Sequence, residues 1–194
     1  MLLWLIIVVG IVFFDQLTKW LTVINLDLYE SFTVIEGFFD FTYRQNTGAA
    51  FSLFDDPDER WIFMSISTIA IIGMAIYLWY NRKGNKLLCV GLSFILGGGI
   101  GNMVDRTLLG YVIDFIDFTI YRAPTGQEIH FPTFNIADSF VCVGVGLFAL
   151  SVVLDEIKAA KLEKQAKLAT AEGAPVSAEM SENTAEADAG AENE

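Results

Sequence analysis

Residues 1–24 read MLLWLIIVVGIVFFDQLTKWLTVI, an apolar run of the length that a helix needs to cross a membrane. The hydrocarbon core of a bilayer is about 30 Å thick, and about 20 helical residues span it. Three further stretches of this kind follow, so the sequence predicts an all-α membrane protein with four transmembrane helices. The expected spans are residues 1–24, 61–80, 87–104 and 136–154.

The composition favours a membrane location, because 54% of the residues are hydrophobic and the mean hydropathy is positive at +0.48. The net charge is −12, but residues 155–194 alone carry ten acidic and four basic residues. We expect this segment to be a charged, largely disordered cytoplasmic tail, although residues 155–171 are rich in good helix formers. Outside the tail no basic cluster exceeds Arg82, Lys83 and Lys86, which excludes nucleic acid as a partner.

Several common classes of site are not indicated. The N-terminal run has no basic n-region and no A-x-A pattern before Asp15, so we interpret it as a retained helix and not as a cleaved signal. Cys89 and Cys142 lie inside apolar runs, and no disulfide framework is expected. His130 is the only histidine and has no His or Cys partner at ligand spacing. We therefore expect no metal and no cofactor.

The distribution of Lys and Arg predicts the orientation, since the more basic side of a membrane protein is normally cytoplasmic. The short loop 81–86 carries three basic residues, and residues 158–167 after the fourth span carry four. The much longer loops 25–60 and 105–135 carry only two each. Both termini are therefore expected in the cytoplasm, and the long loops outside.

The first long loop has the pattern of β-structure. SFTVI and FFDFTY flank Gly37, which predicts a short sheet or hairpin on the outer membrane surface. The aromatic side chains suit the interfacial zone, where such rings are enriched. The expected fold is therefore four transmembrane helices with a small extracytoplasmic β-rich cradle. The aromatic residues concerned are Phe38, Phe39, Phe41, Tyr43, Phe51 and Phe54.

Polar residues near the outer ends of the spans need an explanation, because an ionisable group at bilayer depth costs about 2.5–3.5 kcal/mol. Asn102, Asp105 and Arg106 are spaced i, i+3 and i+4 in GGGIGNMVDR, so they share one helix face. They form either part of a site or a packing seam with a surface ion pair. Asp15 and Lys19 are i and i+4, and an intrahelical ion pair would neutralise both.

Three more segments have two interpretations each. Gly97 and Gly101 form a small-xxx-small pair that serves either close helix packing or contact with a substrate backbone. Asn135 and Asp138 in FNIADS either only cap a helix or belong to a site. Asp114 and Asp117 in DFIDF lie among bulky apolar residues, where desolvation raises the pKa of a carboxyl group. Alternatively, this segment is a strand with one carboxylate facing solvent.

Five motifs occur in order along residues 1–154. They are DQLTK at 15–19, RQNTGAAFS at 44–52, GNMVDR at 101–106, GYVIDFIDF at 110–118 and FNIADS at 134–139. With these motifs the sequence resembles bacterial lipoprotein signal peptidases, the signal peptidase II family. Each motif alone is weak, but five in the same order and topology are specific.

The resemblance implies an aspartic endopeptidase of the bacterial cytoplasmic (inner) membrane, with its active site near the outer face. Its substrates would be diacylglyceryl-modified prolipoproteins, cut before the lipidated cysteine, with membrane lipids around the enzyme. Independently of the resemblance, we expect a monomer, because four helices in one chain can enclose a site without a partner. By motif position Asp114 and Asp138 match the catalytic pair, and Asp105 is expected to orient Arg106. The matches to substrate-binding positions are Asp15, Asn46, Asn102, Arg106 and Asn135.

The chain departs from the family pattern between the two catalytic aspartates, where a turn is inserted at residues 121–131. We expect this insertion to alter the rim of the site and to leave the aspartates in place. The acidic tail also lies outside the family pattern, so the resemblance implies nothing about its role.

Two other classes of function stay open from the residues alone. A small proton-coupled transporter also carries Asp and Arg within the membrane, and it predicts uptake that depends on a pH gradient. Its polar residues should line a transmembrane path, whereas here they gather at one face. A membrane chaperone that only grips lipidated peptides predicts activity that survives loss of either aspartate. No G-x-S-x-G or H-E-x-x-H motif occurs, which disfavours serine and metal chemistry.

Overall fold

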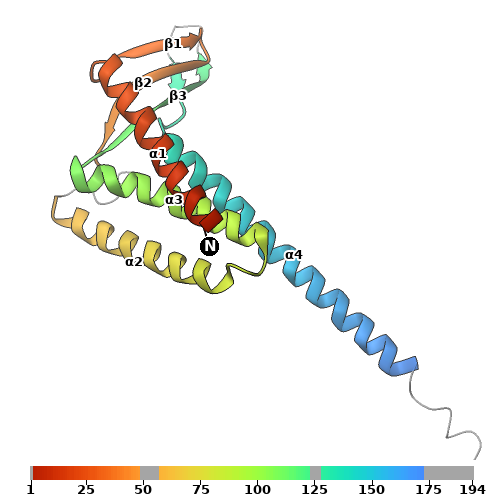
Figure 1. The fold of residues 1–194 in the computed structure, drawn as a ribbon. Coiled ribbons are helices and arrows are strands. Elements are labelled where there is room, and N and C mark those ends of the chain that lie inside the picture. Colours follow the sequence, from red (N-terminus) through yellow and green to blue (C-terminus); the bar gives the residue numbers. More distant parts are fainter. Residues whose placement is uncertain (1, 49–56, 123–127, 173–194) are drawn as a thin grey trace, which may run out of the picture. The chain divides into compact units, whose positions relative to one another are not determined.

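Four long helices and one small antiparallel sheet make up the part of the chain that the computed structural model describes, residues 2–48, 57–122 and 128–172 (Figure 1). All four helices are long and apolar enough to cross a membrane. This confirms the predicted fold class. The helices are α1 (Leu2–Asn25), α2 (Pro57–Asn81), α3 (Lys86–Leu108) and α4 (Ile136–Glu172).

The sheet is built from the two segments that connect α1 to α2 and α3 to α4. Its strand order is β1-β2-β3-β4, and every neighbouring pair is antiparallel. Gly37 closes the β1–β2 hairpin with a φ of 69°, a conformation that glycine adopts without strain, as the flanking sequence predicted. The strands are β1 (Ser31–Ile35), β2 (Phe39–Asn46), β3 (Val112–Arg122) and β4 (Glu128–His130).

The register between β2 and β3 joins two motifs that are far apart in the sequence. Arg44 pairs with Asp114, and Asn46 pairs with Val112. The end of β2 therefore lies beside the start of β3, where the DFIDF motif begins. The inserted segment contributes the end of β3 and all of β4, while its residues 123–127 lie outside the described residues.

Glycines on α3 let two helices and one polar side chain approach closely. A Cβ added at Gly97 would lie 2.8 Å from the Cβ of Ile11 in α1, and one at Gly101 would lie 2.7 Å from Oδ2 of Asp15. A Cβ at Gly98 would collide with the backbone oxygen of Ala137 in α4. The glycines therefore serve close helix packing, which was one of the two interpretations, and this packing places the polar motifs of α1 and α4 beside α3.

The chain forms two units, residues 1–152 and 153–194, and the boundary falls inside α4. The described part of the second unit continues the helix to Glu172 and carries an exposed ion pair between Glu163 and Lys167. The first part of the predicted tail is therefore helical in the structure. Residues 173–194 lie outside the described residues.

Candidate active site

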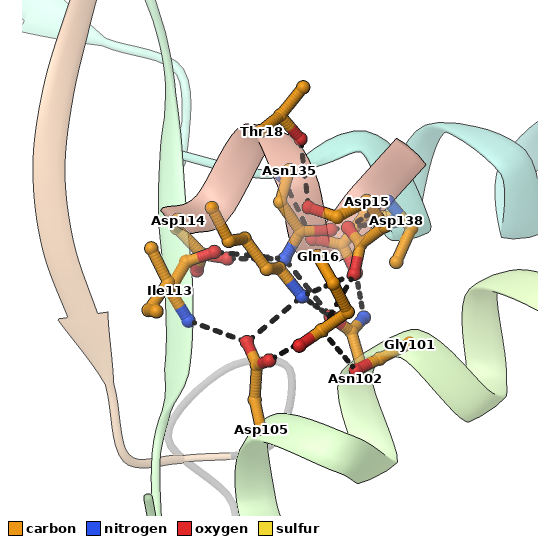
Figure 2. Close-up of polar contacts among 12 residues, drawn as sticks. Asp15, Gln16, Thr18, Gly101, Asn102, Asp105, Ile113, Asp114, Asn135 and Asp138 are labelled. Carbon is orange, nitrogen blue, oxygen red and sulfur yellow. Dashed lines mark hydrogen bonds and ion pairs between the residues drawn. The ribbon is translucent and has the colours of Figure 1, made fainter. Parts of the chain in front are cut away.

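A cluster of polar side chains lies where α1, α3, β3 and the start of α4 meet (Figure 2). The cluster contains charged groups with almost no exposure to solvent, including Asp15 at 0%, Lys19 at 1% and Asp114 at 3%. Charges are buried in proteins only where ion pairs and hydrogen bonds compensate the lost hydration. The contacts of each group therefore indicate what the cluster can do.

Asn135 and Asp138 form a reciprocal cap at the start of α4. The backbone N–H of Asp138 donates to Oδ1 of Asn135 at 2.9 Å, and the backbone N–H of Asn135 donates to Oδ2 of Asp138 at 3.2 Å. This is a capping box, with Asn135 at the N-cap and the carboxylate at the third helical position. The capping interpretation is therefore correct, and it also fixes the Asp138 carboxylate inside the cluster.

Asp114 enters the cluster from β3 and is held by two amides. The side chain of Asn46 donates to its Oδ2 at 2.9 Å, and the side chain of Asn135 donates to its Oδ1 at 2.8 Å. Asp138 accepts a bond of 2.7 Å from the Asn102 amide. Asn135 thus contacts both carboxylates, one through its side chain and the other through its backbone.

Burial raises the pKa of Asp114 from 3.8 to about 6. Desolvation is the largest cause, because it disfavours the charged form. The hydrogen bonds from Asn46 and Asn135 oppose it, whereas the nearby charge of Asp138 adds to it. A carboxyl group with a pKa in this range can give or take a proton near neutral pH. The raised pKa predicted for a carboxyl in DFIDF is confirmed for this residue.

Lys19 lies at the centre of the cluster and contacts more than its predicted helical partner. Its Nζ lies 2.9 Å from Oδ2 of Asp15, 2.9 Å from Oδ2 of Asp105 and 2.9 Å from Oδ1 of Asn102. The intrahelical pair with Asp15 is therefore present, and the same ammonium group also joins α1 to α3. Lys19 was not among the residues assigned to the site from the sequence.

Backbone groups and Gln16 complete the bonding of the two buried carboxylates. The Ala137 N–H donates to Asp15 at 2.9 Å, and the Ile113 N–H donates to Asp105 at 3.1 Å. The Gln16 amide donates to Asp105 at 2.8 Å. The sequence analysis did not assign Gln16 or Lys19 to the site. The signal that could have identified them is their position beside Asp15, at i+1 and i+4, within an apolar run.

A cavity of about 330 Å³ gives access to Asp114. Arg106 reaches toward it from α3, because its Nη2 donates to the backbone oxygen of Gly48 at 3.5 Å and its Nη1 to that of Asn102 at 3.4 Å. The structure thus brings together all seven residues that the sequence assigned to the site. The cavity is lined by Arg44, Gln45, Asn46, Thr47, Gly48, Asp114, Pro132 and Thr133.

A larger cavity of about 500 Å³ lies between the end of α1 and the sheet. Its lining is mostly apolar and contains no titratable side chain. The residues that line the larger cavity are Thr18, Leu21, Thr22, Asn25, Leu26, Phe32, Phe41 and Phe115.

The second carboxylate of DFIDF has separate partners. Asp117 accepts a bond of 3.2 Å from Thr42, and its Oδ1 lies 2.8 Å from Nδ1 of His130 in β4. Asp117 is only 2% exposed. The segment is thus a strand, but neither of its carboxylates faces solvent. Among the described residues, no group of three His, Cys, Asp or Glu side chains could hold a metal.

Comparison with known proteins gives the family. Residues 7–154 match the family model for signal peptidase (SPase) II. The chain is 37% identical to the lipoprotein signal peptidase of Halalkalibacterium halodurans, over 85% of this chain and all of that protein. It is 42% identical to the lipoprotein signal peptidase of Bacillus subtilis, over 76% of this chain and 90% of that protein.

A solved structure, described as a bacterial membrane enzyme determined by the in meso method at 2.3 Å resolution, has the same fold. Its TM-score is 0.63 at 34% identity, and the match covers 79% of this chain and 88% of the other. The match to the family model includes α2 and α3, most of α1, the first half of α4 and the polar cluster described above. This multi-pass bacterial membrane protein therefore belongs to the signal peptidase II family, the peptidases that remove signal peptides from prolipoproteins.

Proposed function

We propose that the protein is an aspartic endopeptidase, with Asp114 and Asp138 as its catalytic pair. The observation that carries this proposal is the pairing itself. Two carboxyl groups from different elements are held by one asparagine in a buried cluster, and one of them lines an open cavity. Two carboxyl groups in a poorly hydrated site do not both ionise readily and tend to share one proton. Such a pair can supply an acid and a base at the same pH.

The surroundings of the two aspartates support different roles for them. Each carboxylate accepts two N–H bonds, but only Asp138 lies in the first turn of a helix, where the helix dipole stabilises a negative charge. Asp114 lies in a strand, and its raised pKa, about 6, keeps it protonated to a higher pH than an ordinary aspartate. We therefore assign Asp138 as the base and Asp114 as the acid when the reaction starts.

The proposed reaction uses one water molecule and no covalent intermediate. Asp138 removes a proton from the water while the water oxygen attacks the scissile carbonyl carbon. Asp114 donates a hydrogen bond to the carbonyl oxygen. The C–N bond of the tetrahedral intermediate then breaks, and the leaving amine takes the proton that Asp138 had accepted. Arg106 and Asn46 lie beside the cavity and are placed to bind the substrate backbone. An oxyanion donor contributes about 2.7–4 kcal/mol in other proteases.

We propose that both termini face the cytoplasm and that the site lies near the outer surface. The sheet joins the end of α1 to the start of α2 and the end of α3 to the start of α4, so the strands and the site belong to one end of the helices. The basic loop 81–86 belongs to the other end, which the distribution of positive charge assigns to the cytoplasm. Bilayer lipids are then direct neighbours of the site. A monomer suffices, because one chain supplies all the groups.

The test is cleavage of a prolipoprotein peptide by the purified full-length protein in detergent. We propose that the substrate carries diacylglycerol on the cysteine after the scissile bond, and we expect mass spectrometry to find cleavage immediately before that residue. The matched control is the same peptide with an unmodified cysteine, which should stay intact. Binding of the lipidated peptide without cleavage would support the chaperone alternative. Uptake driven by a pH gradient in proteoliposomes, again without cleavage, would support a transporter.

The pH dependence of cleavage tests the assigned roles. If Asp114 must be protonated when water attacks, kcat/KM is highest below the pKa of Asp114 and falls as the pH rises through about 6. Above that value we expect a loss of about tenfold per pH unit. The measurement is kcat/KM from about pH 5 to about pH 8 with a peptide that has no titrating group in this range. A profile without a decrease in this interval contradicts the role of Asp114 as the acid.

A further inference from the structure

Lys19 is a buried charge that the proposed mechanism does not use. Its side chain is 1% exposed, and it does not line the cavity beside Asp114. A lysine ammonium has three N–H donors and no acceptor. Here all three donors have an acceptor at 2.9 Å, namely Asp15, Asp105 and the side-chain oxygen of Asn102. The first two contacts are ion pairs, and the third is made with the residue that donates to Asp138.

The neighbours of Asn102 determine which end of its amide faces Asp138. Oδ1 of Asn102 accepts from Nζ of Lys19 and, at 3.0 Å, from Nδ2 of Asn135. Both neighbours present only N–H groups at this point, so an inverted amide would place donors against donors. The oxygen must therefore face Lys19, and the NH₂ group must face Asp138, to which it donates at 2.7 Å.

We propose that Lys19 is a positioning residue for the peptidase reaction, acting through the Asn102 amide on the Asp138 carboxylate. By holding the oxygen of Asn102, Lys19 keeps the NH₂ group directed at Asp138 and stabilises that carboxylate as the base. This inference rests on the proposed function, because it takes Asp138 as a catalytic group. Two charged groups from other elements interact electrostatically with Asp138, namely Arg106 of α3 and Asp114 of β3.

The first experiment compares Lys19→Met with Lys167→Met in the full-length protein. Both lysines form an i,i+4 ion pair with an acidic residue, but the pair of Lys19 is buried and that of Lys167 is exposed. In metal sites, a residue that orients a ligand without touching the metal contributes about 10–100-fold to affinity or activity. We expect a loss of the same order in kcat for Lys19→Met. KM should change by less than about twofold. Lys167→Met should behave like the wild type.

A double-mutant cycle separates positioning from a purely structural role. If Lys19 acts through Asn102, Lys19→Met should lower kcat by less than about twofold in an Asn102→Ala background, whereas independent effects would add. The inference is overturned if the effects of Lys19→Met and Asn102→Ala on kcat are fully additive. A wild-type kcat in Lys19→Met also overturns it.

Lys19→Met could fail to fold, because loss of the ammonium leaves the buried carboxylates of Asp15 and Asp105 without their cation. A second variant therefore keeps the net charge of the cluster unchanged. The double variant Asp15→Asn with Lys19→Met also removes one of these carboxylates. We expect it to fold, as judged by thermal unfolding in detergent, and still to show the lowered kcat. A folded double variant with wild-type kcat also overturns the inference. Asp138→Asn tests the proposed function separately. If this variant still cleaves the peptide, Asp138 is not the base and the proposed function itself fails.

Discussion

Replacing either Asp114 or Asp138 by asparagine is expected to lower cleavage of the lipidated peptide by at least about 10³-fold. An amide of nearly the same shape cannot take a proton from water and cannot deliver one to the substrate. The two single variants should be almost equally inactive, and the double variant should be little worse, because residues that act as a unit are not additive. The measurement is single-turnover cleavage with enzyme in excess, after thermal unfolding in detergent has established that each variant folds.

Asp117→Asn is the matched control for these two variants. Asp117 lies three residues from Asp114 on the same strand and is equally buried, but its partners are Thr42, His130 and, at 3.9 Å, Arg44. We expect this variant to lose stability and to retain kcat within about threefold of the wild type once it is folded. If Asp117→Asn were as inactive as Asp114→Asn, loss of activity would reflect damage to the strand. Residual cleavage by either Asp114→Asn or Asp138→Asn would contradict the assigned pair.

Asn135→Ala is expected to reduce both activity and stability, because one side chain holds both aspartates. Asn135 is 0% exposed, and its amide donates to Asp114 while its oxygen caps the N–H of Asp138. Loss of an N-cap costs about 0.5–2 kcal/mol, and unsatisfied buried partners cost about 1–3 kcal/mol more. We expect kcat to fall by about 10²–10³-fold, as when one oxyanion donor is removed elsewhere. Steady-state kinetics and thermal unfolding measure the two effects.

Asn85→Ala separates the two effects of Asn135→Ala. Asn85 caps α3, where its side chain accepts from the backbone N–H groups of Leu87 and Leu88. It belongs to the opposite end of α3 from Asn102. This variant should lose a similar capping energy and keep its kcat. If kcat fell equally in both variants, the activity lost in Asn135→Ala would reflect helix capping and not the contact with Asp114.

Much of the fold could be predicted from the sequence, because a helix that crosses a membrane needs a continuous apolar run, which is a local feature of the chain. Four apolar runs predicted four helices, and the alternating segments around Gly37 predicted the first hairpin. The helix that continues α4 to Glu172 was only one of two expectations for the start of the tail. Good helix formers favoured it, whereas the composition of the whole segment favoured disorder, and local propensity prevailed over residues 155–172.

The members of the candidate site were predictable as single positions, and their contacts were not. Motif order assigned Asp114 and Asp138, and the spacing of Asn135 and Asp138 already indicated a cap. Lys19 was interpreted only as the helical partner of Asp15, because periodicity describes neighbours on one helix. Its contacts with Asp105 and Asn102 depend on the packing of α1 against α3.

The sequence by itself determined the membrane class, the four helices, the family and the identity of the polar groups, because hydropathy and motifs are local properties of the chain. Only the tertiary structure decided that Asn135 bridges the two aspartates and that Lys19 donates to the Asn102 amide. These contacts require the register of β2 against β3 and the close approach of α3 to α1 and α4 at its glycines. Hydrogen bonds are short and directional, so such contacts form only when packing brings distant segments into a single geometry.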